Sequence, residues 1–515
     1  MKPHLLAPAD SAESVVPAQW GDVSRDLGLD TLFDAMAGGD EYVRAVVARV
    51  IGAAAGAGDA TVIAYRQAAI SDALAHPREL DDLYGIVLEA IATRKQHFFG
   101  LDMLGRYAGS TLHGAIGILQ SLMTHLRRLR DRATEVDAAF SSLAFRDLFG
   151  QLRSELSDDW MADAQGHLAT LQFRDGMMFR AGLGPGNGLV LPVLYSGSDN
   201  RSGWLGRLLH KVPSEYEFRL HPRDEAGARA LSELRDRAIN EVANAVAQAA
   251  QHIFTFLDAL RSDLAFHIGC VRLADRLRTL EVPICLPQFS PPTTPQLRAR
   301  ALRDPTLALI RGRAPEANDF DADRRRLLVV TGANQGGKST FLRSLGVAQI
   351  MLQAGMFVAA TSYVGTLSAG VFTHFKREED PAMQGGKLDE ELVRMSAIAD
   401  HIRPAAIWLS NESFSSTNER EGSQLLLDVV GALGDRGIFV WMVTHLFDAA
   451  RRLNAMRRDD ALFLRAPRAD GGVRTFRLEV GEPQQTSYGA DLYAEVFGND
   501  DPGEQKPASR SAGET

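Results

Sequence analysis

Residues 332–340 of the chain read Gly332-Ala333-Asn334-Gln335-Gly336-Gly337-Lys338-Ser339-Thr340. They satisfy the phosphate-loop pattern G-x-x-x-x-G-K-[ST] at every fixed position. An apolar run at 327–330 precedes the loop and a helical pattern begins at Phe341, so strand, glycine loop and helix follow in the required order. In such a loop the backbone N–H groups and the helix N-terminus surround phosphate oxygens, Lys338 reaches the outer phosphates, and Ser339 is a magnesium ligand. The sequence predicts a site for a nucleotide with Mg²⁺; the alternative is a glycine turn that binds nothing.

The composition is that of a globular protein. At 515 residues the chain has room for about three domains. Its 45% hydrophobic and 23% charged residues argue against a collagen-like, disordered or disulfide-scaffold class. The formal net charge of -9 means that contact with DNA would need local basic patches. Two cysteines, Cys270 and Cys285, are too few for a disulfide framework, which indicates a reducing compartment.

The sequence predicts neither a targeting segment nor a membrane span. The first residues carry Asp10 and Glu13 in place of the basic start and apolar run of a secretory signal. The most apolar long segment, 341–360, is interrupted by Arg343 and Gln349, so we expect a core helix and strand there. A cytoplasmic protein without a membrane partner is expected.

Helical periodicity dominates the first part of the chain. Residues 1–37 show little of it and are expected to form an N-terminal lead-in. From 38 to 168 apolar residues recur at helical spacing, with a break at His76-Pro77, and predict an all-α core. The last pattern, from Leu112 to Leu129, predicts one long amphipathic helix.

A small β-rich insertion is expected at 169–222, where Gly, Pro and Ser are frequent and the apolar runs are short. Within it, residues 182–188 lack the glycine spacing and the following helix of a dinucleotide site, and predict a hairpin turn. Residues 223–300 return to a helical pattern and then a proline-rich connector. If the helix from Asp224 to Ala274 is continuous, it extends roughly 75 Å and indicates a lever arm; several shorter helices in a bundle are the alternative.

An α/β pattern occupies residues 301–497, and the polar segment 498–515 is expected to be a disordered tail. The buried-strand run at 406–409 is soon followed by Asn411 and Glu412. At this strand end a phosphate-loop ATPase places an aspartate near Mg²⁺ and a glutamate that activates water. Glu412 matches that glutamate, whereas Asn411 is a neutral ligand, so weak Mg²⁺ binding and slow hydrolysis are expected.

Three other polar segments lie at the ends of expected helices or strands. A glycine turn at 385–387 opens a helical pattern whose first N–H groups could receive a phosphate. The strand at 437–443 ends in Thr444-His445, which places His445 to sense a terminal phosphate. The hydroxyls of residues 415–417 precede a helix and are expected to cap it.

From about Arg303 to Phe497 the chain resembles the ATPase domain of the MutS family of DNA mismatch repair proteins. The residues that carry the resemblance are Thr331 to Thr340, Glu412, Thr417, Thr444-His445 and Ser487-Tyr488-Gly489, with Arg303-Asp304-Pro305 and Ala317-Asn318-Asp319 upstream. The helical part is similar to the family's core and lever region. The implied fold class is multidomain: an all-α core and lever region with a small β-rich insertion, followed by an α/β P-loop NTPase domain of the ABC/MutS type.

The resemblance implies an ATPase that uses ATP and Mg²⁺ and acts on DNA as a homodimer. It assigns catalysis to Lys338, Glu412 and His445, nucleotide binding to residues 332–340, and the metal to Ser339 and Asn411. In that family a loop of one subunit completes the site of the other, which assigns Gly385, Gly386 and Lys387 to act in trans, with Ser415, Ser416 and Thr417 near the interface. ATP binding would close the two sites and move the levers.

Departures from the family change the expected function. No stretch in the first hundred residues resembles the aromatic-x-glutamate wedge of mismatch readers, so we expect a divergent member without the N-terminal mismatch-recognition domain. Phe414 and Ser416 stand where the family has glycines, and Pro315 stands where it has an aromatic near the adenine. We therefore expect a nucleotide-gated dimeric clamp in DNA repair or recombination. The alternatives are an ATP-driven dimeric switch that binds a protein partner, and a nucleotide-binding scaffold with little hydrolysis.

Overall fold

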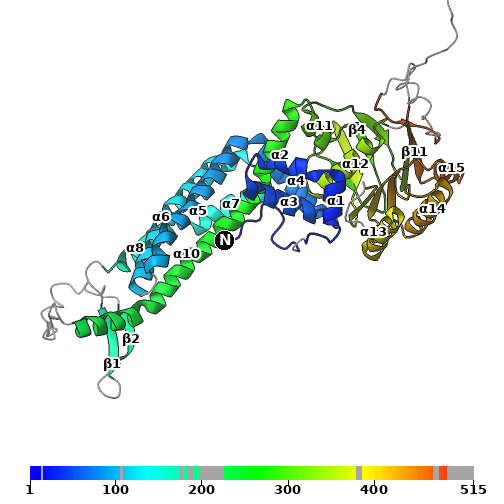
Figure 1. The fold of residues 1–515 in the computed structure, drawn as a ribbon. Helices are drawn as coiled ribbons and strands as arrows, with labels where there is room; N and C mark the ends of the chain where they lie inside the picture. Colours follow the sequence, from blue (N-terminus) through cyan, green and yellow to red (C-terminus); the bar gives the residue numbers. More distant parts are fainter. Residues whose placement is uncertain are drawn as a thin grey trace, which may run out of the picture. The chain divides into compact units, whose positions relative to one another are not determined.

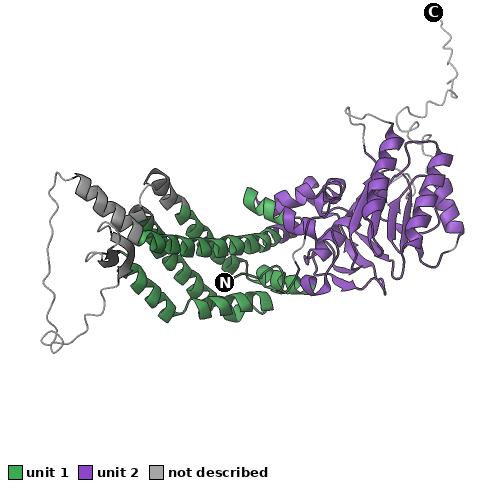
Figure 2. Ribbon diagram, turned by 90° about the horizontal axis from the view of Figure 1, so that it is seen from below, with its two compact units in different colours: residues 1–11, 40–47, 64–271 green, residues 12–39, 48–63, 272–515 purple. Residues whose placement is uncertain are grey.

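The structure is a computed structural model. It describes residues 1–12, 15–104, 108–173, 178–183, 189–195, 225–333, 335–377, 386–456, 458–467 and 475–483. The chain divides into two units, and each is described by itself (Figure 2). Unit 1 contains residues 1–11, 40–47 and 64–271, and unit 2 contains residues 12–39, 48–63 and 272–515.

Helices make up most of the chain from residue 41 to 170. They are α3 (Glu41–Ala53), α4 (Ala60–Ala75), α5 (Pro77–Leu104), α6 (Ala108–Val136), the 3-10 helix η1 (Asp137–Ala139), α7 (Leu143–Glu155) and α8 (Asp158–Thr170). Proline suits the first position of a helix, which is why the predicted break at His76-Pro77 falls between α4 and α5. The predicted long helix is confirmed, because α6 buries Leu112, Leu119 and Leu126 on one side and lies along α5 (Figure 1).

The start of α7 is fixed by a side chain of α4. The carboxylate of Asp72, which is buried, accepts hydrogen bonds from the backbone N–H groups of Ser141 (3.0 Å) and Ser142 (2.7 Å). Phe145 and Phe149 of α7 then pack with Phe140, at ring distances of 4.6 and 5.4 Å. The carboxylate of Asp72 thus fixes the turn before α7, and the aromatic cluster of α7 begins directly after that turn.

The prediction of one continuous helix is correct for residues 225–274, the part of the predicted segment that the structure describes. Helix α10 (Glu225–Thr279) is a single helix of 55 residues, or about 80 Å at 1.5 Å per residue. The prediction of several shorter helices is wrong for this segment. In the part whose side chains are described, Ala243, Phe254 and Leu257 lie on the buried side of the helix.

A hairpin lies in the segment where a β-rich insertion is predicted. Strands β1 (Met178–Leu183) and β2 (Leu189–Tyr195) pair antiparallel, with Leu183 opposite Leu189, so the pairing brackets the glycine-rich stretch as a hairpin requires. The insertion also carries four cations that could contact phosphates, Arg201, Arg207, Lys211 and Arg219, and all four lie outside the described residues.

Unit 2 contains a sheet with six strands among the described residues. They are β6 (Leu327–Gly332), β8 (Val371–Phe375), β9 (Ile407–Asn411), β10 (Phe439–Val443), β11 (Ala461–Ala466) and β12 (Glu479–Val480), in the order β12-β11-β6-β10-β9-β8. All neighbours pair parallel except β11 with β12. The buried strands predicted at 327–330, 406–409 and 437–443 are confirmed as β6, β9 and β10, three of the four interior strands.

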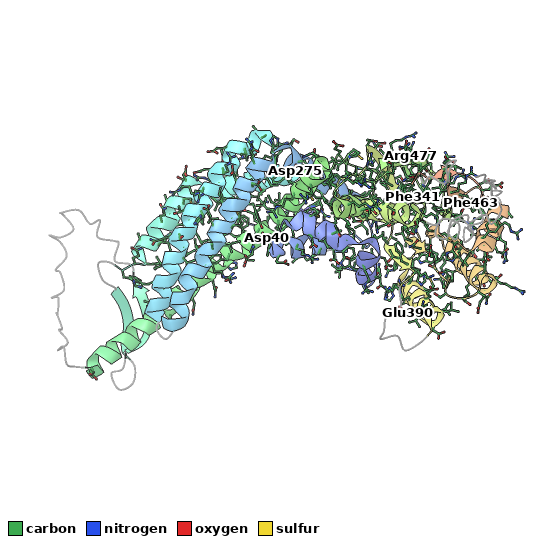
Figure 3. All side chains as sticks on the ribbon, turned by 45° about the horizontal axis from the view of Figure 1, so that its top comes forward. Asp40, Asp275, Phe341, Glu390, Phe463 and Arg477 are labelled. Atoms are coloured by element: carbon green, nitrogen blue, oxygen red, sulfur yellow. The ribbon has the colours of Figure 1, made fainter. Side chains whose placement is uncertain are left out.

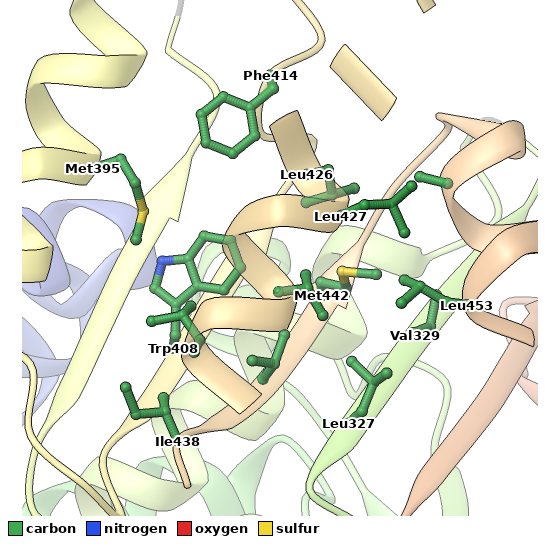
Figure 4. Close-up of a cluster of buried hydrophobic side chains, with 14 of the residues drawn as sticks. Leu327, Val329, Met395, Trp408, Phe414, Leu426, Leu427, Ile438, Met442 and Leu453 are labelled. Atoms are coloured by element: carbon green, nitrogen blue, oxygen red, sulfur yellow. The ribbon is translucent and has the colours of Figure 1, made fainter. Parts of the chain in front are cut away.

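Helices cover both faces of this sheet. On one face, Trp408 of β9 and Met442 of β10 pack against Met395 of α13 (Lys387–His401) and Leu426 of α14 (Glu419–Asp435), with α15 (Phe447–Ala455) beside them (Figure 4). Side chains alternate along a strand, so the residues between these face the other layer, which is α12 (Lys338–Gln353). A Cβ at Gly346 of α12 would lie 3.4 Å from Leu409, which shows how closely α12 approaches β9.

A second sheet of unit 2 has four strands within the described residues. They are β3 (Gln288–Ser290), β4 (Arg298–Leu302), β5 (Asn318–Asp321) and β7 (Ser362–Thr366), in the order β3-β7-β4-β5. Between β4 and β5, Asp304 caps α11 (Pro305–Arg311) by accepting from the N–H of Leu307 at 3.0 Å.

Two helices form within residues 1–37, where the sequence shows little periodicity and a lead-in is predicted. Helices α1 (Trp20–Leu27) and α2 (Leu29–Ala37) form there and belong to unit 2. Gly28, at φ 67°, separates them in the left-handed region, so no apolar pattern extends beyond two or three turns. Leu27 packs on α12, where a Cβ at Gly346 would come within 2.6 Å of it. The two short helices thus add to the layer that contains α12, and each is too short for a long periodic pattern to have predicted it.

Candidate functional site

The glycine loop connects β6 to α12 and depends on its glycines. Gly332 has φ 110°, and a Cβ there would lie 2.7 Å from the backbone nitrogen of Ala466. Gly337 has φ 88° and precedes α12 without a side-chain cap. The first N–H groups of α12 are therefore left to a ligand or water, and they lie beside the positive end of the helix dipole. This arrangement suits an anion.

Lys338 lies in the first turn of α12 and folds back over the loop. Its Nζ donates to the carbonyl oxygens of Gly332 (2.8 Å) and Ala333 (2.9 Å), and the side chain is buried. Burial lowers the pKa of this amine, while the carboxylate of Glu412 acts in the opposite direction. The positive charge is thus held over the loop by backbone carbonyls.

A hydrogen bond joins the loop to the end of β9. The hydroxyl of Ser339 donates to Oδ1 of Asn411 at 2.9 Å. Strand β10 lies between β6 and β9 in the sheet, so the contact spans the width of two strand pairings. The two predicted magnesium ligands are thereby brought together, at the carboxyl edge of the parallel strands where ligands of open α/β sheets bind.

Glu412 and His445 lie on neighbouring turns at the same edge. Glu412 has φ 57°, and its N–H donates to the carbonyl of Val443 at 2.9 Å. Its Oε2 lies 3.8 Å from Nδ1 of His445, which is too far for a direct hydrogen bond, although a protonated imidazole at this distance would attract the carboxylate. His445, Lys338 and Lys376 lower the pKa of Glu412 although burial opposes them. The carboxylate is therefore held ionised.

A pocket of about 900 Å³ opens beside these residues. The glycine loop forms one side of it, and the residues that line it include Gln335 to Phe341, Glu412, His445, Leu302, Asp304, Pro315, Asn318 and Phe476. Its lining combines the glycine loop with apolar residues such as Ala314, Pro315 and Phe476 and with the charged Arg311, Arg313 and Glu316. An anionic ligand that also has an apolar part would fit this mixed lining.

Phe476 is a pocket residue that the sequence did not indicate. Its carbonyl accepts from Nδ2 of Asn318 (3.3 Å), and the N–H of Leu478 donates to Oδ1 of the same asparagine (2.8 Å). Arg477, labelled in Figure 3, pairs with Glu316 at 3.4 Å. Some 158 positions separate Asn318 from Phe476, so no local pattern signals the contact. A bidentate asparagine in β5 therefore brings an aromatic ring to the pocket.

The remaining predicted site residues lie at the start of α13, before α14, or outside the described residues. Gly386 and Lys387 lie at the start of α13, whereas Asn334, Gly385 and residues 486–489 are outside the described residues. The predicted hydroxyl cap of α14 is wrong, because the cap is Asn418, whose Oδ1 accepts from the N–H of Glu421 at 3.0 Å. The hydroxyl of Ser416 instead donates to Glu391 at 2.9 Å.

Known protein families match both units. Residues 58–280 match the family model of the MutS2 N-terminal domain, and residues 328–498 match that of MutS domain V. The helical unit and the sheet-containing unit thus define a multidomain α/β protein. The chain belongs to the MutS family, which confirms the resemblance predicted from the sequence.

Individual relatives match the chain over part of their length. DNA mismatch repair protein MutS of Thermus thermophilus is 30% identical over 206 residues, which is 39% of this chain and 24% of the relative. MutS protein homolog 4 of Mus musculus is 25% identical over 241 residues, 45% of this chain and 24% of the relative. Endonuclease MutS2 of Lacticaseibacillus casei is 27% identical over 196 residues, 36% of this chain and 24% of the relative. The chain thus spans about a quarter of the length of these relatives.

Within the described residues, we find no helix with the length and hydrophobicity that crossing a lipid bilayer requires.

Proposed function

We propose that the pocket binds ATP with Mg²⁺ and that the chain hydrolyses ATP slowly. The hydrogen bond from Ser339 to Asn411 carries this proposal, because it unites the loop hydroxyl and the end of β9 beside Lys338. The volume lies within the range of about 300–1,000 Å³ typical of small-molecule sites. When bound, ATP supplies the phosphoanhydride bond that is broken, and Mg²⁺ supplies positive charge that offsets the charge of the phosphates.

The chain's own residues have separate roles in this proposal. The nucleotide is held by Gly332, Ala333, Asn334, Gln335, Gly336, Gly337, Lys338, Ser339 and Thr340, and the metal by Ser339 and Asn411. Lys338 turns from its backbone carbonyls toward the phosphates. Glu412 orients a water molecule and accepts its proton, while His445 lies where it can contact the outermost phosphate. Because Asn411 adds no charge, metal binding and turnover are weak.

Family membership supports a role on DNA and a dimeric state. The relatives are named as DNA mismatch repair proteins and as an endonuclease, so we propose a homodimeric, nucleotide-gated clamp that acts in DNA repair or recombination. Residues 301–497 would be the P-loop ATPase domain of the ABC/MutS type. Gly385, Gly386 and Lys387 would complete the partner's site, with Ser416 and Thr417 near the interface. A net charge of -9 favours the second candidate, a switch that binds a protein partner.

Glu412→Gln tests hydrolysis. We expect at least a tenfold lower kcat with ATP affinity unchanged, because the amide cannot accept the proton of water. Glu419→Gln, at an exposed position of α14, is the matched control and should hydrolyse ATP like the parent chain. Unchanged turnover in Glu412→Gln would favour a scaffold that binds nucleotide without using this carboxylate.

Mixing two inactive variants tests the composite site. Lys338→Met removes the loop lysine and Lys387→Ala removes the lysine offered in trans. A heterodimer of the two has one intact composite site, so a mixture should recover up to about a quarter of the parent activity. A mixture that stays inactive would contradict the trans arrangement while leaving ATP binding untouched.

Salt dependence separates DNA from a protein partner. We expect branched or linear DNA, followed by fluorescence anisotropy, to bind more weakly as salt rises, because phosphate contacts release counterions. Stimulation of ATPase by one DNA structure would identify the substrate class. If no DNA binds even at low salt, the protein-partner switch becomes the better account of the pocket.

A further inference from the structure

We propose that His374 and Ser413 form a buried clamp that positions Glu412 for hydrolysis, and that His374 is therefore a positioning residue. This inference rests on the proposed function. His374 is in β8, two strands away from β10, and is completely buried. It lies behind the turn that carries Glu412 and lines no part of the pocket.

The hydrogen bonds of His374 define its tautomer. Nε2 lies 3.0 Å from the carbonyl oxygen of Glu391, which can only accept, so Nε2 carries the hydrogen. Burial, with help from the neighbouring Arg394, lowers the pKa of His374 to about 4, so the ring is neutral at neutral pH. Nδ1 is then an acceptor, and it lies 2.7 Å from Oγ of Ser413, which is also 2.8 Å from the backbone carbonyl oxygen of His374. Both atoms can only accept, so the hydroxyl of Ser413 donates to His374 and its one proton is shared between the ring and the carbonyl.

A second hydroxyl extends this chain in one direction. Oγ of Ser410 lies 2.7 Å from Oγ of Ser413. Since the single proton of Ser413 is used on the ring or the carbonyl of His374, Ser410 must be the donor. The order is Ser410 to Ser413 to His374 to the carbonyl of Glu391. Residues on both sides of Glu412 are thus fixed by bonds whose direction is defined.

A second tie closes the clamp on the far side of the turn. The hydroxyl of Ser416 donates to Oε1 of Glu391 at 2.9 Å, so Glu391 holds the segment through its side chain and His374 through its backbone. The ring of Phe414 stacks on His374 with 5.5 Å between centroids and 30° between planes. Segment 413–416 is therefore held from both ends and along its middle.

Backbone strain indicates that the turn needs such a clamp. Glu412 and Phe414 have φ of 57° and 60°, a left-handed region that is unfavourable for a non-glycine residue and persists only where the surroundings enforce it. A glycine would adopt this φ without that cost, but it would also adopt other φ values as easily and would not hold the turn in one conformation. The carbonyl of Phe414 is also pressed against α14, where a Cβ at Gly422 would lie 2.4 Å from it. The direction of the Glu412 carboxylate thus depends on contacts made by its neighbours.

Loosening the clamp should affect the chemical step and spare nucleotide binding. Lys338 and Ser339 belong to the loop after β6, and their hydrogen bonds go to the loop's own carbonyls and to Asn411. A misdirected Glu412 would therefore lower kcat while the affinity for ATP stays the same. Displacement by about 1 Å from the productive geometry can reduce the rate by about a hundredfold.

Ser413→Ala is the test, and Ser423→Ala is its matched control. Ser423 is also a fully buried serine of unit 2, but its hydroxyl has no hydrogen-bond partner among the described residues. In the full chain we expect Ser413→Ala to lower kcat at least tenfold, with the Kd for ATP within twofold of the parent value. Ser423→Ala should match the parent in both. A second readout is the ¹⁵N spectrum of selectively labelled histidine, in which Nδ1 of His374 should shift when its donor is removed, with His374→Asn used for assignment.

The outcomes separate this inference from the proposed function. Unchanged kcat in Ser413→Ala, in a parent chain that hydrolyses ATP, would overturn the clamp alone. A protonated Nδ1 in the parent spectrum would also overturn it, because the direction of the hydrogen bonds would be reversed. A parent chain that does not hydrolyse ATP would remove the proposed hydrolysis and the clamp's role together.

Discussion

The hydroxyl of Ser339 donates a 2.9 Å hydrogen bond to Oδ1 of Asn411, so two neutral groups meet where the proposed metal site needs charge. Asn411→Asp would add a carboxylate at that point. We expect the Mg²⁺ concentration for half-maximal ATPase activity to fall by about tenfold, equivalent to about 1.4 kcal/mol. Titrating Mg²⁺ at saturating ATP measures this directly.

Asn454→Asp is the control for this prediction. It adds the same charge in α15, at a residue that does not line the pocket. It should leave the Mg²⁺ requirement unchanged. Equal effects of the two substitutions would mean that only the net charge matters and that Asn411 has no special relation to the metal.

Lys338→Met should abolish ATP binding and leave the fold intact. The amine is buried and burial lowers its pKa, so an apolar side chain of similar length removes a charge that the folded state accommodates poorly. A ligand at one hundred times its Kd stabilises a protein by about 2.7 kcal/mol. Differential scanning fluorimetry should therefore show a rise in Tm with ATP and Mg²⁺ for the parent chain and none for Lys338→Met. A variant that still gains Tm would place the nucleotide elsewhere.

Gly332→Ala should destabilise unit 2 by more than about 2 kcal/mol. Its backbone is at φ 110°, and the new Cβ would lie 2.7 and 2.8 Å from the backbone nitrogen and oxygen of Ala466. Gly431→Ala is the matched substitution within α14, where nothing lies within 4 Å. It should stabilise the helix by up to about 1 kcal/mol. Chemical denaturation compares the two; equal midpoints would mean that β11 yields to the added carbon.

Contacts between residues close in the chain could be predicted from the sequence. The apolar run at 327–330 and the loop up to Thr340 lie within about ten residues of one another. They could be predicted because a short buried strand and a helix N-terminus are local structures. The strands before Glu412 and His445 were identifiable for the same reason. Their convergence at one edge follows from parallel pairing, which places all carboxyl ends together.

Contacts between distant residues could not be predicted. Phe476 reaches the pocket because Asn318 in β5 donates to its carbonyl through Nδ2 and accepts from the N–H of Leu478 through Oδ1. Ser413 meets His374 only once β8 and β9 are paired, 39 positions apart. Helices α1 and α2 have apolar residues at helical spacing over only about two turns each, and α1 packs against α12, which lies more than 300 positions away. Each of these contacts arises from tertiary packing between distant segments, and no pattern in the sequence indicates which distant segments will meet.

The last prediction concerns acid stability and His267 of α10. Nδ1 lies 2.8 Å from the carbonyl of Asp263 and must donate to it, while Nε2 is buried without a partner among the described residues. Burial, opposed by that hydrogen bond and assisted by Arg66, lowers the pKa of His267 to about 4. In the unfolded chain a histidine has a pKa near 6.5. Between these two values the unfolded state binds a proton that the folded state does not, so stability falls as pH decreases from 6.5 to 4.

The size and the controls of this effect can be measured. At 1.36 kcal/mol per pKa unit, the complete loss is roughly 3 kcal/mol. His267→Met cannot take up a proton, so its Tm should decline less than that of the parent between pH 6.5 and pH 4.5. His252→Gln removes an exposed histidine of the same helix and should follow the parent curve. If His267→Met loses Tm as steeply as the parent chain, other buried groups must be responsible, of which His374, with its pKa also lowered to about 4, is the first to examine.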